Sequence, residues 1–196
     1  MPAPDFPERR ATPAAPGIRA DEYWLRSFTP SPVKRRLRAR VRLDGGRLTV
    51  RYVLEGALDD LLLPWPDPAQ ERRDELWRST CFEAFLGAPG SMAYHEINLA
   101  PAGHWACYSF SAPREGMCPE SALAALDWKT HRVPGHYAIR FTLELDRIGW
   151  HAQEGLELGI SAILLREDGA REFWALTHAG PAPDFHLHES FLLRLP

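Results

Sequence analysis

Two segments in the middle of the chain place carboxylates beside aromatic, thiol and amide side chains at alternating positions. In the first, Asp74–Gly87, Glu83 lies between Cys81 and Phe85 at a spacing of two. Successive side chains of a strand point to opposite faces, so these three share one face and the apolar residues between them share the other. We weigh two interpretations equally: Glu83 belongs to a ligand site, or it is a solvated residue whose neighbours are covered by a loop.

The second segment, Tyr94–Trp105, repeats the pattern with Tyr94, Glu96 and Asn98 on one face. If this strand is the neighbour of the strand that carries Glu83, the two polar faces merge. Carboxylates and an amide can fix sugar hydroxyls while aromatic rings contact the C–H face of a sugar. A wet outer sheet surface is at least as common an explanation.

The third segment, Phe173–His188, is expected to hold Trp174, Leu176 and His178 on one face of a strand. A proline-containing loop follows with Asp184, Phe185, His186 and His188. Several histidines and a carboxylate suit a transition metal, but their spacing matches no zinc signature. We therefore favour a structural role in which Asp184 and His186 hold the loop by hydrogen bonds and Phe185 anchors it. No bound metal is expected.

Established catalytic motifs are missing from the sequence. It has no Gly-x-Ser-x-Gly elbow, phosphate-binding glycine loop, dinucleotide fingerprint or His-Glu-x-x-His zinc motif. Glu83 and Glu96 have the residue types of a glycosidase pair, but nothing else in the sequence favours hydrolysis. We expect a protein that is not an enzyme.

The elements that position these segments are predicted to be short strands. Leu37, Ala39, Val41 and Leu43 alternate with arginines, and Asp44-Gly45-Gly46 then leads into a second alternating run from Leu48 to Leu54, which is typical of a β-hairpin. Further strands are expected at Thr80–Leu86, Tyr94–Leu99, His104–Phe110, Tyr137–Leu145, Leu156–Leu165, Glu172–Leu176 and Phe191–Leu195. Only Asp59–Leu63 and Asp146–Trp150 are candidate helices. The 18 prolines and the many turns favour an all-β, two-sheet antiparallel sandwich of jelly-roll type.

Length and composition limit the other possibilities. The 196 residues are expected to form a Pro/Ala/Arg-rich disordered tail over 1–20 and one domain over 21–196. A net charge of −3 argues against nucleic acid and anionic membranes as partners, and no apolar run is long enough to span a bilayer. With no apolar signal region at the start and three scattered cysteines, a cytoplasmic location with reduced thiols is the expectation.

These segments resemble the DOMON-like superfamily, whose β-sandwich is shared with family-nine carbohydrate-binding modules. The resemblance is carried by Trp77 ahead of the acidic strand Cys81–Leu86, by the Asn98–Gly103 segment (Asn-x-x-Pro-x-Gly) and by the late aromatic pair Phe173-Trp174. The ending, from Leu176-Thr177-His178 to Pro183-Asp184-Phe185-His186, is similar to a small bacterial branch of this superfamily.

The resemblance implies two classes of ligand. Sugar-binding members clamp a sugar between tryptophans, a role that Trp77 or Trp105 would fill here together with Trp174. Haem-binding members ligate iron with Met and His, for which the candidates are Met92 or Met117 with His178 or His186. We expect no cofactor, since no Met/His pair stands at strand positions.

The function expected from the sequence is non-catalytic binding of a saccharide or similar small polar ligand on a sheet face. The alternatives are a haem- or metal-binding sandwich and an interaction or scaffold domain without a small-molecule ligand. The expected ligand-binding residues are Trp77, Glu83, Tyr94, Glu96, Asn98, Trp105, Trp174 and His178, and the expected structural-loop residues are Asp184, Phe185 and His186.

Overall fold

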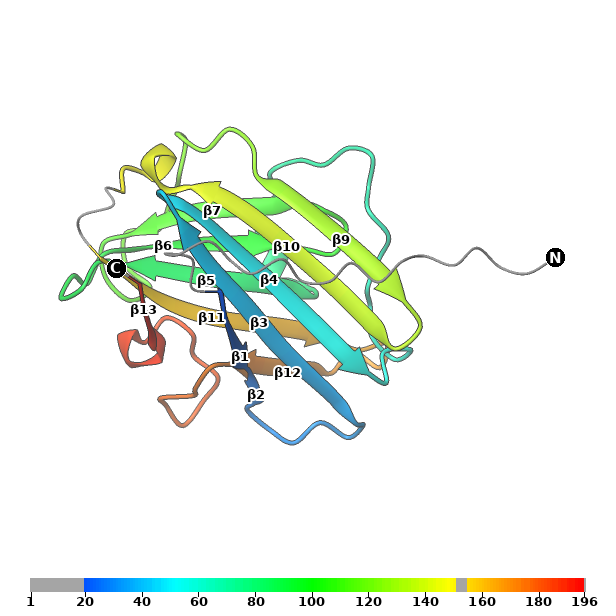
Figure 1. The fold of residues 1–196 in the computed structure, drawn as a ribbon. Coiled ribbons are helices and arrows are strands. Elements are labelled where there is room, and N and C mark those ends of the chain that lie inside the picture. Colours follow the sequence, from blue (N-terminus) through cyan, green and yellow to red (C-terminus); the bar gives the residue numbers. More distant parts are fainter. Residues whose placement is uncertain (1–19, 151–154, 196) are drawn as a thin grey trace.

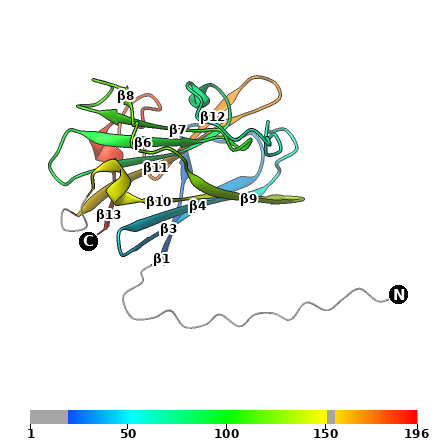
Figure 2. The same ribbon diagram turned by 90° about the horizontal axis from the view of Figure 1, so that it is seen from above.

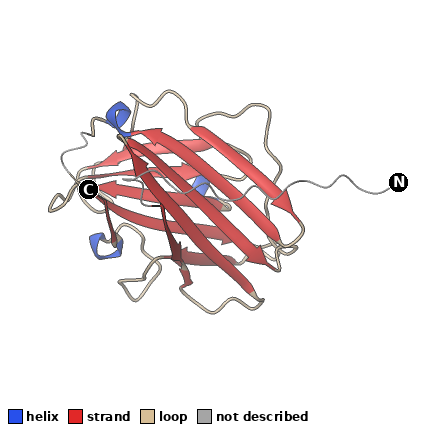
Figure 3. Cartoon of the chain, in the orientation of Figure 1, coloured by secondary structure: helices blue, strands red, loops and turns tan. Residues whose placement is uncertain are grey.

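The computed structural model describes residues 20–150 and 155–195, and these residues form two antiparallel β-sheets packed face to face (Figures 1 and 3). This confirms the all-β sandwich predicted from the sequence. The tail expected over residues 1–20 lies, up to residue 19, outside the described residues. No helical segment within the described ranges has the length and hydropathy needed to cross a membrane.

The five-stranded sheet has the order β1-β3-β4-β10-β9, and the eight-stranded sheet has the order β2-β12-β11-β5-β6-β7-β8 with β13 paired to β11. The strands of the first sheet are β1 (Ala20–Trp24), β3 (Arg35–Asp44), β4 (Arg47–Gly56), β9 (Asp127–Val133) and β10 (His136–Glu144). Those of the second are β2 (Arg26–Ser27), β5 (Cys81–Gly87), β6 (Tyr94–Leu99), β7 (Trp105–Phe110), β8 (Cys118–Pro119), β11 (Leu156–Leu165), β12 (Arg171–Ala175) and β13 (Leu193–Leu195). Short 3-10 helices lie at η1 (Leu76–Arg78), η2 (Leu145–Ile148) and η3 (His188–Ser190).

The predicted hairpin is the β3–β4 pair, in register from Arg35 opposite Gly56 to Asp44 opposite Arg47. Its two-residue turn has Gly45 at φ 56° and Gly46 at φ 84°. A turn with positive φ at both central residues matches the right-handed twist of the flanking strands, and glycine adopts it without strain.

The main core fills the space between the sheets, which appear as two layers in Figure 2. It is built from alternate residues of each strand, such as Leu37 and Val41 of β3 and Phe82, Ala84 and Leu86 of β5. The alternation read from the sequence therefore correctly identifies the inner face of both strands.

The other face of the eight-stranded sheet is also covered, which makes every residue of β5 buried. A second apolar cluster lies there, in which Cys81 and Phe85 of the sheet pack with residues of η1 and of the chain after β12, such as Leu76, Phe185 and Phe191. Because polar groups are costly to bury beneath such a layer, the carboxylates on this face require an explanation.

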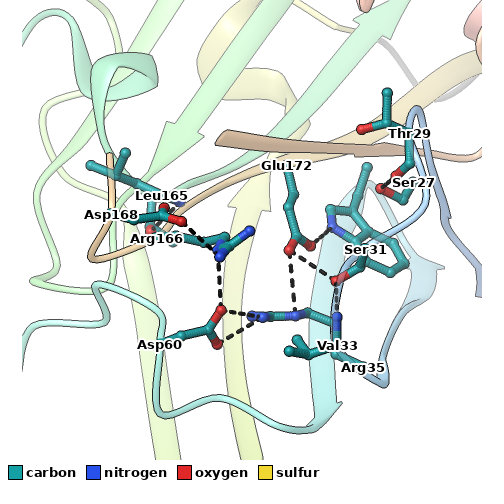
Figure 4. A network of polar contacts seen from close by, with 12 residues as sticks. Ser27, Thr29, Ser31, Val33, Arg35, Asp60, Leu165, Arg166, Asp168 and Glu172 are labelled. Atoms are coloured by element: carbon teal, nitrogen blue, oxygen red, sulfur yellow. Dashed lines mark hydrogen bonds and ion pairs between the residues drawn. The ribbon is translucent and has the colours of Figure 1, made fainter. Parts of the chain in front are cut away.

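A buried ion network joins the two sheets at one edge (Figure 4). Arg35 of β3 is completely buried, and its Nη2 lies 2.7 Å from both carboxylate oxygens of Asp60. Its Nε lies 3.6 Å from Glu172 of β12, which also accepts hydrogen bonds from Ser31 Oγ (2.9 Å) and Trp174 Nε1 (3.0 Å). The network fixes β12 against the opposite sheet.

One of the two expected helices is absent, and the other is found only in part. Asp59–Leu63 is not helical, because Leu61 makes an isolated bridge to Arg166 and the loop is held to the end of β11. Asp146–Trp150 contributes only to the 3-10 helix η2. Strand β9 was not predicted, since its residues are mostly exposed and lack a clear apolar alternation.

Candidate functional site

A pocket of about 340 Å³ opens on the outer face of the eight-stranded sheet, between the segments that cover it. Its floor comes from β5, β6, β11 and β12, and its walls come from η1, the loop after β7 and the loop after β12. It is lined by Trp77, Glu83, Glu96, Phe110, Arg114, Met117, Ile163, Arg171, Phe173, Pro183, Phe185 and His186.

The strand register brings the two glutamates together. Strands β5 and β6 are neighbours, with Glu83 opposite Asn98 and Phe85 opposite Glu96. Glu83 and Glu96 are therefore diagonal neighbours on one face, a relation in which long side chains interact. They are only 2% and 4% exposed, so the solvated outer surface considered from the sequence is excluded.

Both carboxylates are held by neutral hydrogen-bond donors. Ser161 Oγ of β11 donates to Glu83 Oε2 at 3.2 Å, and Asn98 Nδ2 donates to Glu96 Oε1 at 2.8 Å. Cys81 Sγ donates in turn to Asn98 Oδ1 at 3.3 Å. Asn98 thus lies beneath the pocket and orients Glu96, and it does not line the pocket itself.

The environment raises the pKa of both carboxyl groups of this pair. Burial raises the pKa of Glu83 to about 8, with the charge of Glu96 as the next cause. Burial likewise raises the pKa of Glu96 to about 7, against the hydrogen bond from Asn98 and the charge of Arg114, which lower it. The two groups together therefore retain a proton near neutral pH.

The opposite wall is built by the loop after β12 and the loop after β7. His186 Nδ1 lies 2.7 Å from Tyr94 Oη, and the backbone N–H of Arg114 donates to the same oxygen at 3.2 Å. Asp184 accepts from Arg114 Nη2 at 2.9 Å and from the backbone N–H of His186 at 3.0 Å. Burial, and then the charge of Arg114, lowers the pKa of His186 to about 4, which leaves its ring neutral at pH 7.

Four aromatic rings complete the lining: Trp77, Phe110, Phe173 and Phe185. Phe110 stacks on Tyr94 with 4.8 Å between ring centroids, so Tyr94 supports the wall from behind. Carboxyl groups below and aromatic rings around them give the cavity both polar and apolar recognition surfaces.

The structure brings some of the expected ligand-binding residues together in the pocket. Trp77, Glu83 and Glu96 line the pocket, and Tyr94 and Asn98 contact residues that do. Phe185 and His186, expected only to hold the loop, also line it.

Three expected ligand residues lie elsewhere. Trp105 and Trp174 face the main core, because they pair with the core-facing residues Leu99 and Ala162 and cross-strand partners share a face. The expectation that Trp174 shares the surface of Glu83 is therefore wrong. His178 Nε2 lies 2.9 Å from the carbonyl oxygen of Arg26, away from the pocket.

The remaining lining residues were not predicted from the sequence as parts of this pocket, and Met117 was considered only as a haem ligand. Phe173 was one position from the chosen Trp174, and the register of the strand decides which of the two faces the pocket. Arg114 and Met117 come from a loop whose position over the sheet no local pattern reveals. Arg171 is the first residue of β12, and a charged residue at the start of a strand gives no sign of a ligand site in the sequence.

The described residues contain no group of three or more His, Cys, Asp and Glu side chains that could hold a metal ion. His178, His186 and His188 do not converge, since their ring nitrogens meet Arg26 O, Tyr94 Oη and Met92 O respectively.

Two of the residues considered as haem ligands from the sequence lie in the pocket. Met117 and His186 both line the cavity, but its floor carries the carboxyl groups of Glu83 and Glu96.

No family model matches the chain, and no curated protein sequence matches it. A solved structure, however, is similar to this chain. It is a Bacteroides uniformis protein to which carbohydrate binding has been attributed, and the two share 14% sequence identity with a TM-score of 0.64. The alignment covers 87% of this chain and 84% of that one. At this identity the likeness establishes a shared β-sandwich fold.

Proposed function

We propose that the outer-face pocket binds a saccharide or similar small polar ligand without transforming it. The observation that carries this proposal is the combination of two buried carboxyl groups on the floor with four aromatic rings around them. Carboxyl groups bond sugar hydroxyls, and aromatic faces pack against the C–H surface of a sugar ring.

The size of the cavity supports a small ligand. A volume of about 340 Å³ is at the lower end of the range of ligand pockets, which suits one or two sugar units rather than a polymer chain. The similar Bacteroides uniformis fold and the resemblance to the DOMON-like superfamily agree with this proposal.

The test is calorimetric titration of the full chain with a panel of mono- and disaccharides, repeated with Glu96→Gln and Phe173→Ala. We expect millimolar to micromolar dissociation constants for at least one sugar and a loss of about tenfold or more in each variant. Glu144→Gln is the matched control, since Glu144 lies on the other sheet and pairs with Arg47. Unchanged affinity in both pocket variants would place any binding elsewhere.

A hydrolytic role would use the same diagonal pair of glutamates, one of them protonated. The assay for this role is release of nitrophenol from aryl glycosides. Release that is lost in both Glu83→Gln and Glu96→Gln would show that the pocket is an active site. We expect no turnover above that of the double variant.

A further inference from the structure

Among the described residues, the two carboxyl groups on the pocket floor have no ion-pair partner, although Arg114 and Arg171 line the same pocket. Within the described residues, no lysine, arginine or histidine nitrogen forms an ion pair with Glu83 or Glu96 within 4.0 Å, whereas Glu172, a carboxylate of comparable burial, does form one. Glu172, for example, is 5% exposed and meets Arg35. The hydrogen bonds to the two carboxyl groups come from neutral donors, the hydroxyl group of Ser161 and the side-chain amide of Asn98.

The two arginines that line the pocket interact with other partners. The side chain of Arg114 is 59% exposed and pairs with Asp184. Arg171 is exposed and donates from Nη2 to the carbonyl oxygen of Arg78 at 3.0 Å. Solvent partly screens these two charges, although the charge of Arg114 still lowers the pKa of both glutamates. His186 is neutral at pH 7 because burial lowers its pKa.

The other groups that surround the pair add no positive charge. Cys81, Tyr52 and Tyr94 all have a pKa raised by burial, and they are neutral at pH 7. Asp184 is ionised: burial raises its pKa, but the hydrogen bonds from Arg114 and His186 outweigh this effect and lower it.

The aromatic walls of the pocket can also bind a cation. Rings of Trp and Phe attract a cation over their faces, most strongly when water is excluded, and four such rings line this cavity. A positive charge placed between them and above the two carboxyl groups would gain both interactions at once.

We propose that the natural ligand carries an ammonium group that is seated over Glu83 and Glu96, so that within the saccharide class the site selects amino sugars over neutral, N-acetylated and acidic sugars. This inference rests on the proposed function and narrows it. Binding of the cation forms no covalent bond and displaces the proton that the carboxyl pair shares.

The experiment compares matched sugars by isothermal titration calorimetry on the full chain. Glucosamine, galactosamine and mannosamine are each set against the parent hexose and the N-acetyl derivative, with glucuronic acid as the anionic probe. A fourth comparison uses 2-aminoethanol against ethylene glycol, which tests the ammonium group without a sugar ring. Each titration is run at about pH 7 in two buffers of different ionisation enthalpy, so that protons released on binding are counted.

We expect an amino sugar to bind about tenfold or more tightly than its neutral and N-acetylated partners, and to release up to about one proton. The preference should disappear in Glu83→Gln and in Glu96→Gln and persist in Glu144→Gln. Equal or tighter binding of the neutral, N-acetylated or acidic sugar would overturn the cation preference and leave the saccharide site standing. Binding of 2-aminoethanol alone, sensitive to both glutamine variants, would keep the cation site and overturn the saccharide assignment. Absence of all binding would overturn both.

Discussion

Replacement of Glu83 by glutamine is expected to stabilise the protein near neutral pH. The folded chain holds a proton on Glu83 up to about pH 8, because burial raises its pKa, whereas the unfolded chain releases it near the ordinary value of 4.5. Between these values the unfolded state binds fewer protons, so stability falls as pH rises. At about pH 7.5 the difference amounts to about 4 kcal/mol for this single group. Glutamine is isosteric and uncharged, so it removes this penalty.

The assay is urea unfolding of wild type and Glu83→Gln at about pH 4.5 and about pH 7.5. We expect the variant to be about 2–4 kcal/mol more stable at the higher pH and near wild type at the lower, where the unfolded chain is half protonated and the difference is only about 0.4 kcal/mol. Glu144→Gln, which alters a surface ion pair with Arg47, should change stability by less than about 0.5 kcal/mol at either pH. A Glu83→Gln variant that is less stable at the higher pH, or equally stabilised at both, would show that the buried charge is already compensated.

Three further predictions concern the elements around the pocket. Arg35→Met should lower the free energy of unfolding, measured in urea, by about 3–5 kcal/mol, because it leaves the buried carboxylate of Glu172 without its cation, while Arg36→Ala at an exposed neighbouring position should stay within about 0.5 kcal/mol; equal effects would contradict the network. Asp184→Ala should cost about 1–2 kcal/mol by the same assay, since its partners are partly exposed, and an unchanged midpoint would deny it a structural role. Trp77→Ala should weaken ligand binding with little loss of stability, and Trp174→Ala should cost about 3–5 kcal/mol; the reverse pattern would show that the two tryptophans have been assigned to the wrong faces.

The sequence alone predicts the strands of the two sheets, because the alternation of apolar and polar residues is a local property. The inner face of β5 follows from the spacing of Phe82 and Leu86, and the β3–β4 turn follows from Gly45 and Gly46. The same alternation places Glu83 on the outer face, but it does not say what covers that face.

Long-range packing decides the rest of the site. Trp174 and Phe173 are equally plausible pocket residues until the pairing with β11 assigns one to each face. Arg114 reaches the pocket through a loop anchored to Tyr94 and Asp184, residues that are distant in the sequence. Such contacts leave no periodic signal, and only the assembled sheet reveals that Glu83 and Glu96 are diagonal neighbours.

The most direct test of the central claim, that this pocket is a ligand site, is a titration of the isotopically labelled full chain followed by backbone amide NMR. With a saccharide panel that includes the amino sugars, up to about 10 mM, we predict shifts confined to the strands and loops around Glu83, Glu96 and Phe173. Shifts that instead map to another surface, such as the exposed Trp65, or no shifts at all, would contradict it.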